Sequence, residues 1–421
     1  RKKDSSDTAR TITWPSGVTW DGGVAPTLIT NAASGVDTQQ FMLLTRDEGV
    51  TWYGWENFNY DPIVSTAWVW GQNHHGQLGQ NNETQYSSPT QIPGITWSSG
   101  TASGGAQSAI KTDGTLWGWG RNDLGLLGLN TPSNSKYSSP VQVPGTTWAT
   151  LAKKDISGTG FSGAIKTDGT LWIWGVNYYG QLGLNQSHTG TYKSSPTQIP
   201  GTTWSNAAIV DNQSFAIKTD NTLWTWGRND KGMSGVNSQT KYSSPVQIPG
   251  TTWARVSAGA NNDAVATKTD GTLWAWGNGD YGALGQNNTT ERSSPVQIPG
   301  TTWATDEYSI MVCNRSVYSI KTDGTLWVWG ENNYGQLGDN SKTNRSSPIQ
   351  IPGTTWSKVG TIADGQGVSA TKTDGTLWSW GYGSYGRLAQ NDTISRSSPI
   401  QVGALTSWLT PVGGYMAIQR S

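Results

Sequence analysis

Six aspartates recur through the sequence at nearly regular intervals, and a ring of carboxylates could bind a cation or act in acid–base catalysis. They are Asp113, Asp168, Asp220, Asp270, Asp323 and Asp374. Each stands before Gly, or before Asn221 in one copy, and Asp-Gly is typical of tight hairpin turns. A turn therefore explains these aspartates without chemistry, and we predict no catalytic residue among them.

Other residues that could do chemistry are few. Three histidines (His74, His75 and His188) and one cysteine, Cys313, are too few for a zinc site of the usual kind. We interpret Cys313 as a small buried hydrophobe and the first two histidines as exposed loop residues. No G-x-S-x-G, HExxH or phosphate-loop motif occurs. The sequence therefore predicts a protein that is not an enzyme, with no metal and no cofactor.

The aspartates belong to a ten-residue stretch, KTDGTLWGWG at residues 111–120, which recurs five more times after a degenerate first copy. One strand ends at Thr112 and the next begins at Thr115, which predicts a β-hairpin around a tight two-residue turn with positive φ. Trp117 and Trp119 lie two residues apart and so share one face of the second strand. We assign the tryptophans of these repeats to packing rather than to ligand stacking.

A repeat of about 50 residues organises most of the chain. The second Trp of each unit recurs at intervals of 49 to 55 residues, at Trp70, Trp119, Trp174, Trp226, Trp276, Trp329 and Trp380. Each unit continues through a Gly-rich loop into SSP-x-Q-I-P-G-T-T-W, and the prolines place that strand at the outer edge of a sheet. One unit therefore supplies about four strands, as in a propeller or a β-solenoid.

The two ends of the repeat region complement each other. The first unit lacks its KTDGT strand, and the tail from Gly413 to Gln419 aligns with the missing segment. Pairing of the two would close a ring of seven blades and leave no open sheet edge at the seam. The predicted fold is therefore all-β, a seven-bladed propeller closed by the N- and C-terminal strands of one blade.

Composition limits the function further. The 421 residues carry 28 basic and 28 acidic side chains, a net charge of zero, which implies no basic surface for nucleic acid. No apolar run approaches the ~18 residues of a membrane span, and no signal peptide is visible. Only 34% of the residues are hydrophobic, but 25 Trp supply large buried areas. We expect neither nucleic-acid binding nor membrane insertion.

The sequence divides into three parts. Residues 1–10 are polar and are expected to form a linker or frayed end. Residues 11–60 contain short strand-forming segments separated by turn-rich ones, which predicts a small β module. Residues 61–421 hold the repeats. Because the chain begins with Arg1, we expect a longer polypeptide or a processed product.

The repeats resemble a known family. The segment SAGANNDAVATKTDGTLWAWGNGDYGALG at 257–285 and its counterparts are similar to the regulator of chromosome condensation repeat, whose family fold is a seven-bladed β-propeller. Members that act as exchange factors or chromatin binders use charged loops and a basic arm, which are not seen here. The His common in the family is replaced by Ala106, Phe161, Gln213, Asp263, Ser316 and Gly367. The resemblance implies the fold, and exchange activity is not carried over.

The N-terminal module has a resemblance of its own. TITWPSGVTWDGGVAPTL and RDEGVTWYGW are similar to a short β-rich segment of bacteriophage tail-fibre and other virion fibre proteins. This resemblance covers some 45 residues, and the uniform repeats also resemble those of environmental and viral propellers that serve as display scaffolds. It implies that the module binds other virion proteins, and it leaves self-association open.

The variable segments of the repeats are the predicted binding surface. From the Trp of each TTW to the Lys or Gln that ends the following strand, the separation ranges from 11 to 18 residues. Loops of different length on a rigid ring are a common way to build a binding surface. The two longest insertions supply the predicted partner-binding residues, which are Lys153, Lys154, Asp155, Phe161, Asp306, Glu307, Tyr308, Asn314 and Arg315.

Three functions remain. The preferred hypothesis is a non-enzymatic bacteriophage virion protein, a tail-fibre, receptor-binding or decoration component, located in the extracellular virion particle. Its propeller would contact a host surface receptor, protein or glycan, or another virion protein. The alternative is a cellular regulator of the chromosome condensation repeat family that binds a protein partner such as a small GTPase. A surface-polysaccharide-acting enzyme is third.

Overall fold

The computed structural model describes residues 65–103, 105–131, 135–154, 160–186, 192–210, 212–362, 365–413 and 416–420, together with the backbone of three strands before them. The chain divides into two units, Arg1–Ile63 and Val64–Ser421. In the first unit, β1 (Val18–Trp20) pairs in parallel with β3 (Trp52–Glu56), which pairs antiparallel with β2 (Phe41–Thr45). Most of the segment that resembles fibre proteins lies outside the described residues.

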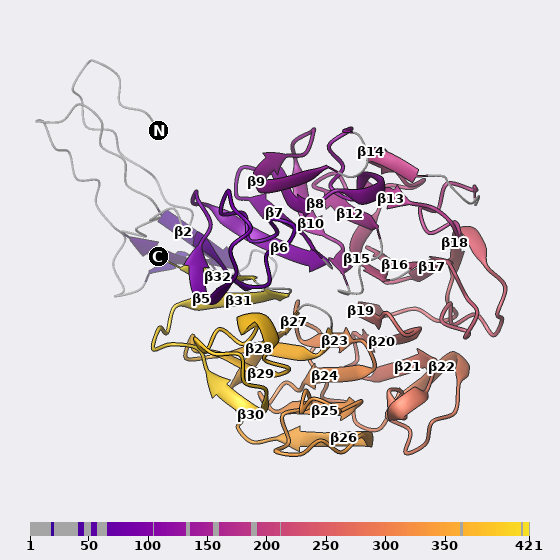
Figure 1. Ribbon diagram of the computed structural model, residues 1–421. Helices are drawn as coiled ribbons and strands as arrows, with labels where there is room; N and C mark the ends of the chain where they lie inside the picture. Colours follow the sequence, from indigo (N-terminus) through magenta and orange to yellow (C-terminus); the bar gives the residue numbers. More distant parts are fainter. Residues whose placement is uncertain are drawn as a thin grey trace, which may run out of the picture. The chain divides into compact units, whose positions relative to one another are not determined.

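The second unit consists of seven antiparallel sheets of four strands, one of them extended by a short fifth strand, arranged as the blades of a propeller, as predicted (Figure 1). The first strand of each blade lies nearest the centre of the ring. These inner strands are β6 (Trp97–Ser103), β10 (Trp148–Leu151), β15 (Trp204–Val210), β19 (Trp253–Gly259), β23 (Ile310–Cys313), β27 (Trp356–Ile362) and β31 (Trp408–Gly413). The second strands are β7 (Ala106–Lys111), β12 (Phe161–Lys166), β16 (Gln213–Lys218), β20 (Asp263–Lys268), β24 (Ser316–Ile320), β28 (Gly367–Lys372) and β32 (Met416–Arg420).

The third strand of each blade carries the Trp pair, and the fourth forms the outer rim. The third strands are β8 (Leu116–Arg121), β13 (Leu171–Val176), β17 (Leu223–Gly227), β21 (Leu273–Gly277), β25 (Leu326–Gly330), β29 (Leu377–Gly381) and β4 (Ser65–Gly71). The outer strands are β9 (Lys136–Gln142), β14 (Tyr192–Gln198), β18 (Tyr242–Gln247), β22 (Arg292–Ile298), β26 (Arg345–Ile351), β30 (Arg396–Gln401) and β5 (Tyr86–Gln91). The outer strands contain the SSP prolines, which confirms the predicted edge position.

One blade is assembled from both ends of the ring, as predicted. Strand β32 pairs antiparallel with β4, with Ala417 opposite Trp68. The sheet order β31-β32-β4-β5 is the same as in the other six blades. We call this sheet the seam blade. It leaves no unpaired strand at the junction, so the ring closes with the same sheet geometry throughout.

The hairpins are present, but their turns differ from the prediction. Gly114 has a positive φ of 76°, whereas Asp113 does not. The Gly114 N–H donates to the Lys111 carbonyl at 3.0 Å, and the Lys111 N–H to the Thr115 carbonyl at 2.9 Å, so the loop spans three residues. In one copy Asn221 takes the glycine position with φ 61°. The hairpin loop is a type I turn followed by one residue in the left-handed conformation. Asn adopts that conformation more readily than most residues, which explains why Asn221 can replace the glycine.

Every blade is fastened to its predecessor by the same contacts. The second Trp of each third strand is at most 1% exposed. Its Nε1–H donates to a carbonyl in the Gly-rich loop of the preceding blade at 2.7–3.0 Å. An Asn N–H after that loop donates to an outer-strand Ser carbonyl of the next blade at 2.7–2.9 Å, from Asn81 to Ser138 in one case and from Asn391 to Ser87 at the seam. The indoles therefore join blades as well as filling the space between them.

Short helices complete the second unit. Three 3₁₀ turns lie in the Gly-rich loops, η1 (Asp123–Gly125), η2 (Asp280–Gly282) and η4 (Ser384–Gly386). A two-residue strand, β11 (Lys153–Lys154), pairs in parallel with Ala208 and Ile209 of the next blade. No helix in the described part of the chain has the length and apolar character needed to cross a membrane.

Candidate functional site

The strand directions give the ring two distinct faces. On one face, in six blades, the residue that ends or directly follows the third strand donates its N–H to the turn between the first and second strands at 2.8–3.0 Å, for example Arg121 to Gly105. We call this side, with those turns and the Gly-rich loops, the glycine-loop face. On the other face, the hairpin Gly accepts from the Trp that begins the next blade, for example Gly114 from Trp148 at 3.0 Å. We call it the DG-turn face.

The DG-turn face is nearly the same in six blades. Each repeat aspartate accepts through Oδ1 the N–H and the hydroxyl of the Thr two residues later, at 2.9–3.0 Å and 2.6–2.7 Å. These bonds lower the pKa of each carboxyl below 3.8. The hydrogen bond from the Thr hydroxyl has the largest effect, and that from the Thr N–H comes next. The aspartates therefore shape turns, as predicted.

The glycine-loop face differs from blade to blade. The position before the loop glycine holds His75, Leu124, Tyr179, Lys231, Tyr281, Tyr334 and Tyr385. Tyr281 and Tyr385 are 39% and 44% exposed, and Tyr178 is 38% exposed. Tyr281 and Tyr385 also have positive φ values of 59° and 63°, which are uncommon for bulky residues. The loops thus hold several phenol rings at the surface in a fixed backbone conformation.

Side chains from adjacent blades contact these loop residues. The guanidinium of Arg315 lies 5.0 Å from the ring centroid of Tyr281, and that of Arg228 lies 5.5 Å from Tyr179. Further contacts between neighbouring blades are Lys231 with Glu291 at 2.6 Å, Lys136 with Glu83 at 3.3 Å, Tyr334 with Tyr382 at 4.9 Å and His74 with Tyr385 at 5.9 Å. Charged groups and aromatic rings of neighbouring blades therefore contact one another on this face, and these contacts hold the rings in place.

The two histidines of the first loop have different environments. His74 is exposed, as predicted, and its ring meets that of Tyr385 edge to face. His75 is partly buried, and burial together with the nearby Arg121 and Lys136 lowers its pKa below 6.5. Burial and the two neighbouring cations thus favour the neutral imidazole of His75.

The first predicted insertion is only partly available to a partner. Phe161 is 1% exposed and packs in the core with Ile209 and Trp226. It is not a surface residue, because it begins a second strand whose side chain faces the neighbouring blade. Lys153 and Lys154 form β11, which follows the inner strand toward the glycine-loop face. Asp155 lies outside the described residues.

The second insertion is split between the two faces. Asp306 and Glu307 are exposed and lie between Trp303, which bridges Lys321, and Ser309, at the DG-turn end of the blade. Tyr308 is buried, and burial raises its pKa; its carbonyl accepts the Val359 N–H of the next blade at 2.8 Å. Tyr308 therefore connects two blades.

The remaining two residues of this insertion lie on the glycine-loop face. Asn314 and Arg315 form the turn between β23 and β24, where Cys313 pairs with Ser316. The Arg315 guanidinium also lies 3.6 Å from the Glu331 carboxylate. Of the predicted binding residues with described side chains, Arg315 contacts the exposed Tyr281 and Asn314 lies on the same face, whereas Asp306 and Glu307 lie at the DG-turn end.

Sequence reasoning missed the loop tyrosines. The loops were identified from the sequence by their glycines alone, whereas they also hold the exposed side chains of Tyr178, Tyr281 and Tyr385. The signal was present in the variation at the position before the loop glycine. Cys313 is 1% exposed, in agreement with its assignment as a buried hydrophobe.

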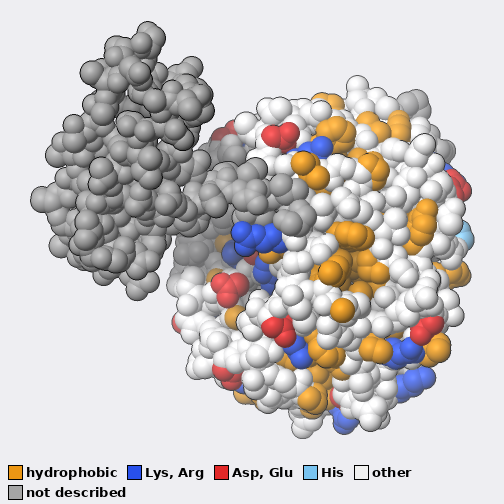
Figure 2. Space-filling view, turned by 90° about the vertical axis from the view of Figure 1, so that its left-hand side faces the viewer, with side chains coloured by type: hydrophobic (Ala, Val, Ile, Leu, Met, Phe, Trp, Pro, Cys, Tyr) orange, Lys and Arg blue, Asp and Glu red, His pale blue; other side chains and the backbone are white. Residues whose placement is uncertain are grey.

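The surface chemistry of the ring shows no concentrated charge in the available view. In Figure 2, basic and acidic side chains lie interspersed on a largely uncharged surface, and hydrophobic groups form small separate patches. Within the described residues, no group of three or more His, Cys, Asp or Glu is placed to hold a metal ion. The arrangement is suited to binding through aromatic and paired charged groups.

Known proteins share both sequence and fold with this chain. The ultraviolet-B receptor UVR8 of Arabidopsis thaliana is 26% identical over 337 residues, which cover 79% of this chain and 64% of UVR8. The mitochondrial RCC1 domain-containing protein RUG3 of the same plant is 26% identical over 58% of this chain and 57% of its own length. The chain thus spans less than two thirds of these relatives.

A solved structure supports the fold independently. Prp20p of Saccharomyces cerevisiae, studied for its binding to Gsp1p and histones, superposes with a TM-score of 0.69 at 16% identity, over 85% of this chain and 91% of that chain. At this identity the likeness establishes the propeller architecture alone.

These relatives overturn the preferred function. The prediction of a bacteriophage virion protein, with its virion location, tail-fibre role and host adhesion, is wrong, because the relatives UVR8 and RUG3 are cellular proteins of a plant. The error came from the short N-terminal resemblance, which was given more weight than the repeats. The findings favour the alternative, a cellular protein of the repeat family.

The repeat pattern itself decides the family. The pattern described as "Regulator of chromosome condensation (RCC1) repeat" matches residues 66–110, 113–152, 168–217, 270–306, 323–371 and 374–413, more than half of the chain. Each matched segment contains strands of the blades described above. The chain belongs to the RCC1 repeat family.

Proposed function

We propose that this chain is a non-enzymatic binding protein whose glycine-loop face docks a protein partner. The observation that carries the proposal is the set of exposed tyrosines, including Tyr281 and Tyr385, bordered by side chains of the neighbouring blades. Tyrosine presents a large contact area with little conformational entropy to lose, and it is enriched at the energetic centres of interfaces. Arg315 against Tyr281 further limits the motion of that ring.

The difference between the two faces supports the choice of surface. The DG-turn face repeats the same aspartate, threonine and lysine in six blades, so it offers little to distinguish one partner from another. On the glycine-loop face, the position before the glycine holds His, Leu or Lys in three blades and Tyr in four, and discrimination between partners requires such differences. Prp20p, which shares the fold, is described as binding Gsp1p and histones, and we carry over only that the partner is a protein, such as a small GTPase.

Site-specific photocrosslinking tests this proposal. A benzoylphenylalanine at Tyr281 or Tyr385 is expected to form discrete crosslinked species with proteins of the source cell. Thr301, which is exposed on the opposite face, provides the control position. Excess unlabelled chain should suppress the products, and the Tyr179→Ala, Tyr281→Ala, Tyr385→Ala triple variant should not. Products formed equally from Thr301, or suppressed equally by the triple variant, would refute the assignment of the face. Purified Gsp1p and histones are the first candidates to test for direct binding.

A further inference from the structure

Six blades contain a lysine ammonium that lies over two indole rings at once. The Nζ atoms of Lys111, Lys166, Lys218, Lys268, Lys321 and Lys372 are 4.0–5.0 Å from the centroids of the first Trp of the hairpin and of the Trp that ends TTW. The two rings of each pair meet nearly edge to face at 6.1–6.5 Å. Because the ring faces attract positive charge, each pair is a cation-binding site that the chain fills with its own lysine.

The seam blade has the two indoles without the lysine. The rings of Trp68 and Trp408 lie 6.3 Å apart at 74°, the geometry of the other six pairs. The register that places Trp97 opposite Lys111 places Trp408 opposite Gln419. The Gln419 amide donates to the Ser407 hydroxyl at 2.9 Å. Within the described part of the chain, no Lys or Arg lies over either ring.

The neighbouring cation does not substitute for the lysine. Arg420 follows Gln419 in β32, and successive side chains of a strand point to opposite faces. Arg420 is exposed, whereas Gln419 is buried. The substitution therefore leaves this one aromatic pair with a neutral side chain at the position of the ammonium.

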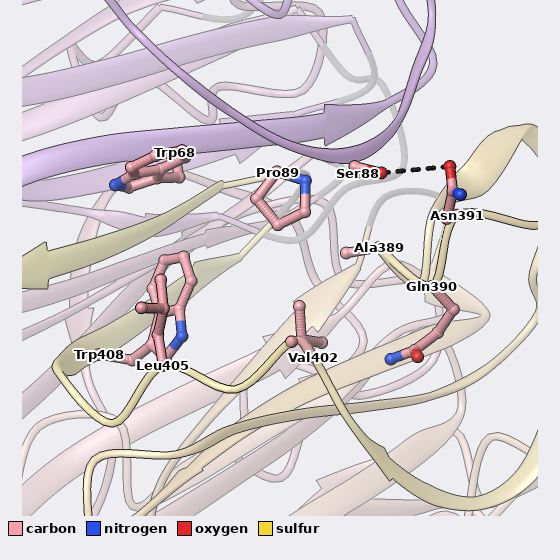
Figure 3. Close-up of a pocket in the computed structure, with 10 residues that line it drawn as sticks. Trp68, Ser88, Pro89, Ala389, Gln390, Asn391, Val402, Leu405 and Trp408 are labelled. Atoms are coloured by element: carbon pink, nitrogen blue, oxygen red, sulfur yellow. Dashed lines mark hydrogen bonds between the residues drawn. The ribbon is translucent and has the colours of Figure 1, made fainter.

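A pocket opens onto the same two rings. In Figure 3, Trp68 and Trp408 lie on one side of the pocket and Gln390 and Asn391 on the other. Its volume is about 420 Å³, and Gln419 does not line it. The equivalent groove beside Trp303 and Trp327 has a volume of about 350 Å³ and is lined by Lys321. The groove of the seam blade is thus the larger of the two; both grooves are lined by their pair of indoles, and only the second is also lined by a lysine.

The other walls fit an aliphatic stem. Leu405 is 48% exposed, and Pro89 and Val402 also line the pocket. The link from Val402 to Trp408 is one residue longer than that from Ile298 to Trp303 and lacks its proline. A lysine side chain buries its methylene groups on apolar surface while its ammonium seeks a polar or aromatic partner. The pocket offers both parts of that environment.

We propose that the Trp68–Trp408 pocket binds the side chain of a lysine from a partner protein, with the ammonium over both indoles. The argument for a polypeptide lysine is internal, since the other six copies of this ring pair each hold one. The pocket lies between two blades toward the DG-turn face, and it does not depend on the function proposed for the glycine-loop face.

The test compares two small probes on the full-length chain by NMR titration. The first is Nα-acetyl-lysine N-methylamide, and the second is the norleucine counterpart, which keeps the stem and lacks the ammonium. We expect saturable binding of the lysine compound at one site, at least tenfold tighter than the norleucine compound. Gln419→Lys should weaken that binding at least tenfold, because its own ammonium then occupies the rings.

Two further variants keep the test decisive. Trp68→Leu retains an apolar wall and removes one ring, so it should also weaken binding of the lysine compound about tenfold. Lys321→Gln removes the internal ammonium from the equivalent groove and should raise the number of binding sites from one to two. No saturable binding to the wild-type chain, equal affinity for both probes, or unchanged affinity in both Gln419→Lys and Trp68→Leu would overturn the proposal.

Discussion

The indole Nε1–H of Trp70 donates to the carbonyl of Arg387 at 2.7 Å, although the two residues are 317 positions apart in the sequence. The six other blade interfaces contain the same bond between residues 42 to 48 positions apart. The seam is therefore held by the same chemistry as the rest of the ring, with β32 supplying the missing strand.

Removal of β32 should weaken the seam severely. Met416, Ala417 and Ile418 are at most 2% exposed, so deletion of residues 416–421 loses about 4–6 kcal/mol of burial and exposes two strand edges. We expect the melting temperature to fall by roughly 10 °C in differential scanning calorimetry. Arg420→Ala, which keeps the strand and changes an exposed side chain, is the control. Equal melting temperatures for the deletion variant and Arg420→Ala would contradict a stabilising role for β32 in closing the ring.

The two tryptophans of a hairpin should differ in their contribution to stability. Trp276 is fully buried, and its Nε1–H donates to the Met233 carbonyl of the preceding blade at 2.7 Å. Trp276→Phe should cost about 2–3 kcal/mol in urea unfolding, because that carbonyl loses its donor. Trp274 is partly exposed and donates to the Thr272 hydroxyl, so Trp274→Phe should cost about 1 kcal/mol or less. Equal losses of unfolding free energy in Trp276→Phe and Trp274→Phe would argue against a stabilising role for the hydrogen bond from Trp276 to Met233.

A pair of glycine substitutions should separate backbone strain from the clash between blades. Gly180 has φ 81°, and a Cβ there would lie 2.6 Å from Ser243 Cα in the neighbouring outer strand. Gly403 has φ 60° with nothing within 4 Å of such a Cβ. Gly403→Ala should cost about 1 kcal/mol for the left-handed backbone alone. Gly180→Ala should cost at least about 3 kcal/mol in the same denaturant experiment. Similar losses of unfolding free energy in the two variants would mean that the loop around Gly180 moves to accommodate the Cβ without cost.

Acid should weaken the six hairpins together. The pKa values of the repeat aspartates are lowered from 3.8 in the folded chain, chiefly by the threonine hydroxyls. A carboxyl with a depressed folded pKa stabilises the fold above its unfolded pKa and loses that contribution as the pH falls through the folded value. The melting temperature should therefore drop below about pH 4.

A variant with all six aspartates replaced by Asn provides the comparison for the acid experiment. Asn keeps an acceptor oxygen for the Thr N–H and hydroxyl without a titratable proton. Its melting temperature should fall less between pH 5 and pH 2.5 than that of the wild-type chain, measured by circular dichroism. Parallel curves for the two proteins would show that other groups dominate the acid transition.

The fold was accessible from sequence because its determinants are local and repeated. The Trp pair, the Asp-Gly turn and the SSP strand each have one structural interpretation, and the period then sets the number of blades. The turn type was missed because Gly114 alone has the left-handed backbone that both Asp113 and Gly114 were expected to share.

The binding surface was less accessible for a geometric reason. Insertion length shows where a loop is long, but the direction of the strand decides which face it reaches. Asp306 and Arg315 belong to one insertion and yet lie at opposite ends of β23. Phe161 was misassigned because a residue that begins a strand can face the core. Gln419 was visible in the sequence, but its significance needed the register that places it opposite Trp408.

The position of β4 has a mechanical consequence. The chain before Ser65 enters the ring at the third strand of a blade, which is hydrogen-bonded to β32 on one side and β5 on the other. A pull applied through that connection loads two neighbouring strands at once, rather than peeling a single strand from an exposed edge. The ring is thus attached to the preceding residues at an interior strand, so a pull through that connection is resisted by the β4–β32 pairing of the seam and the β4–β5 pairing together.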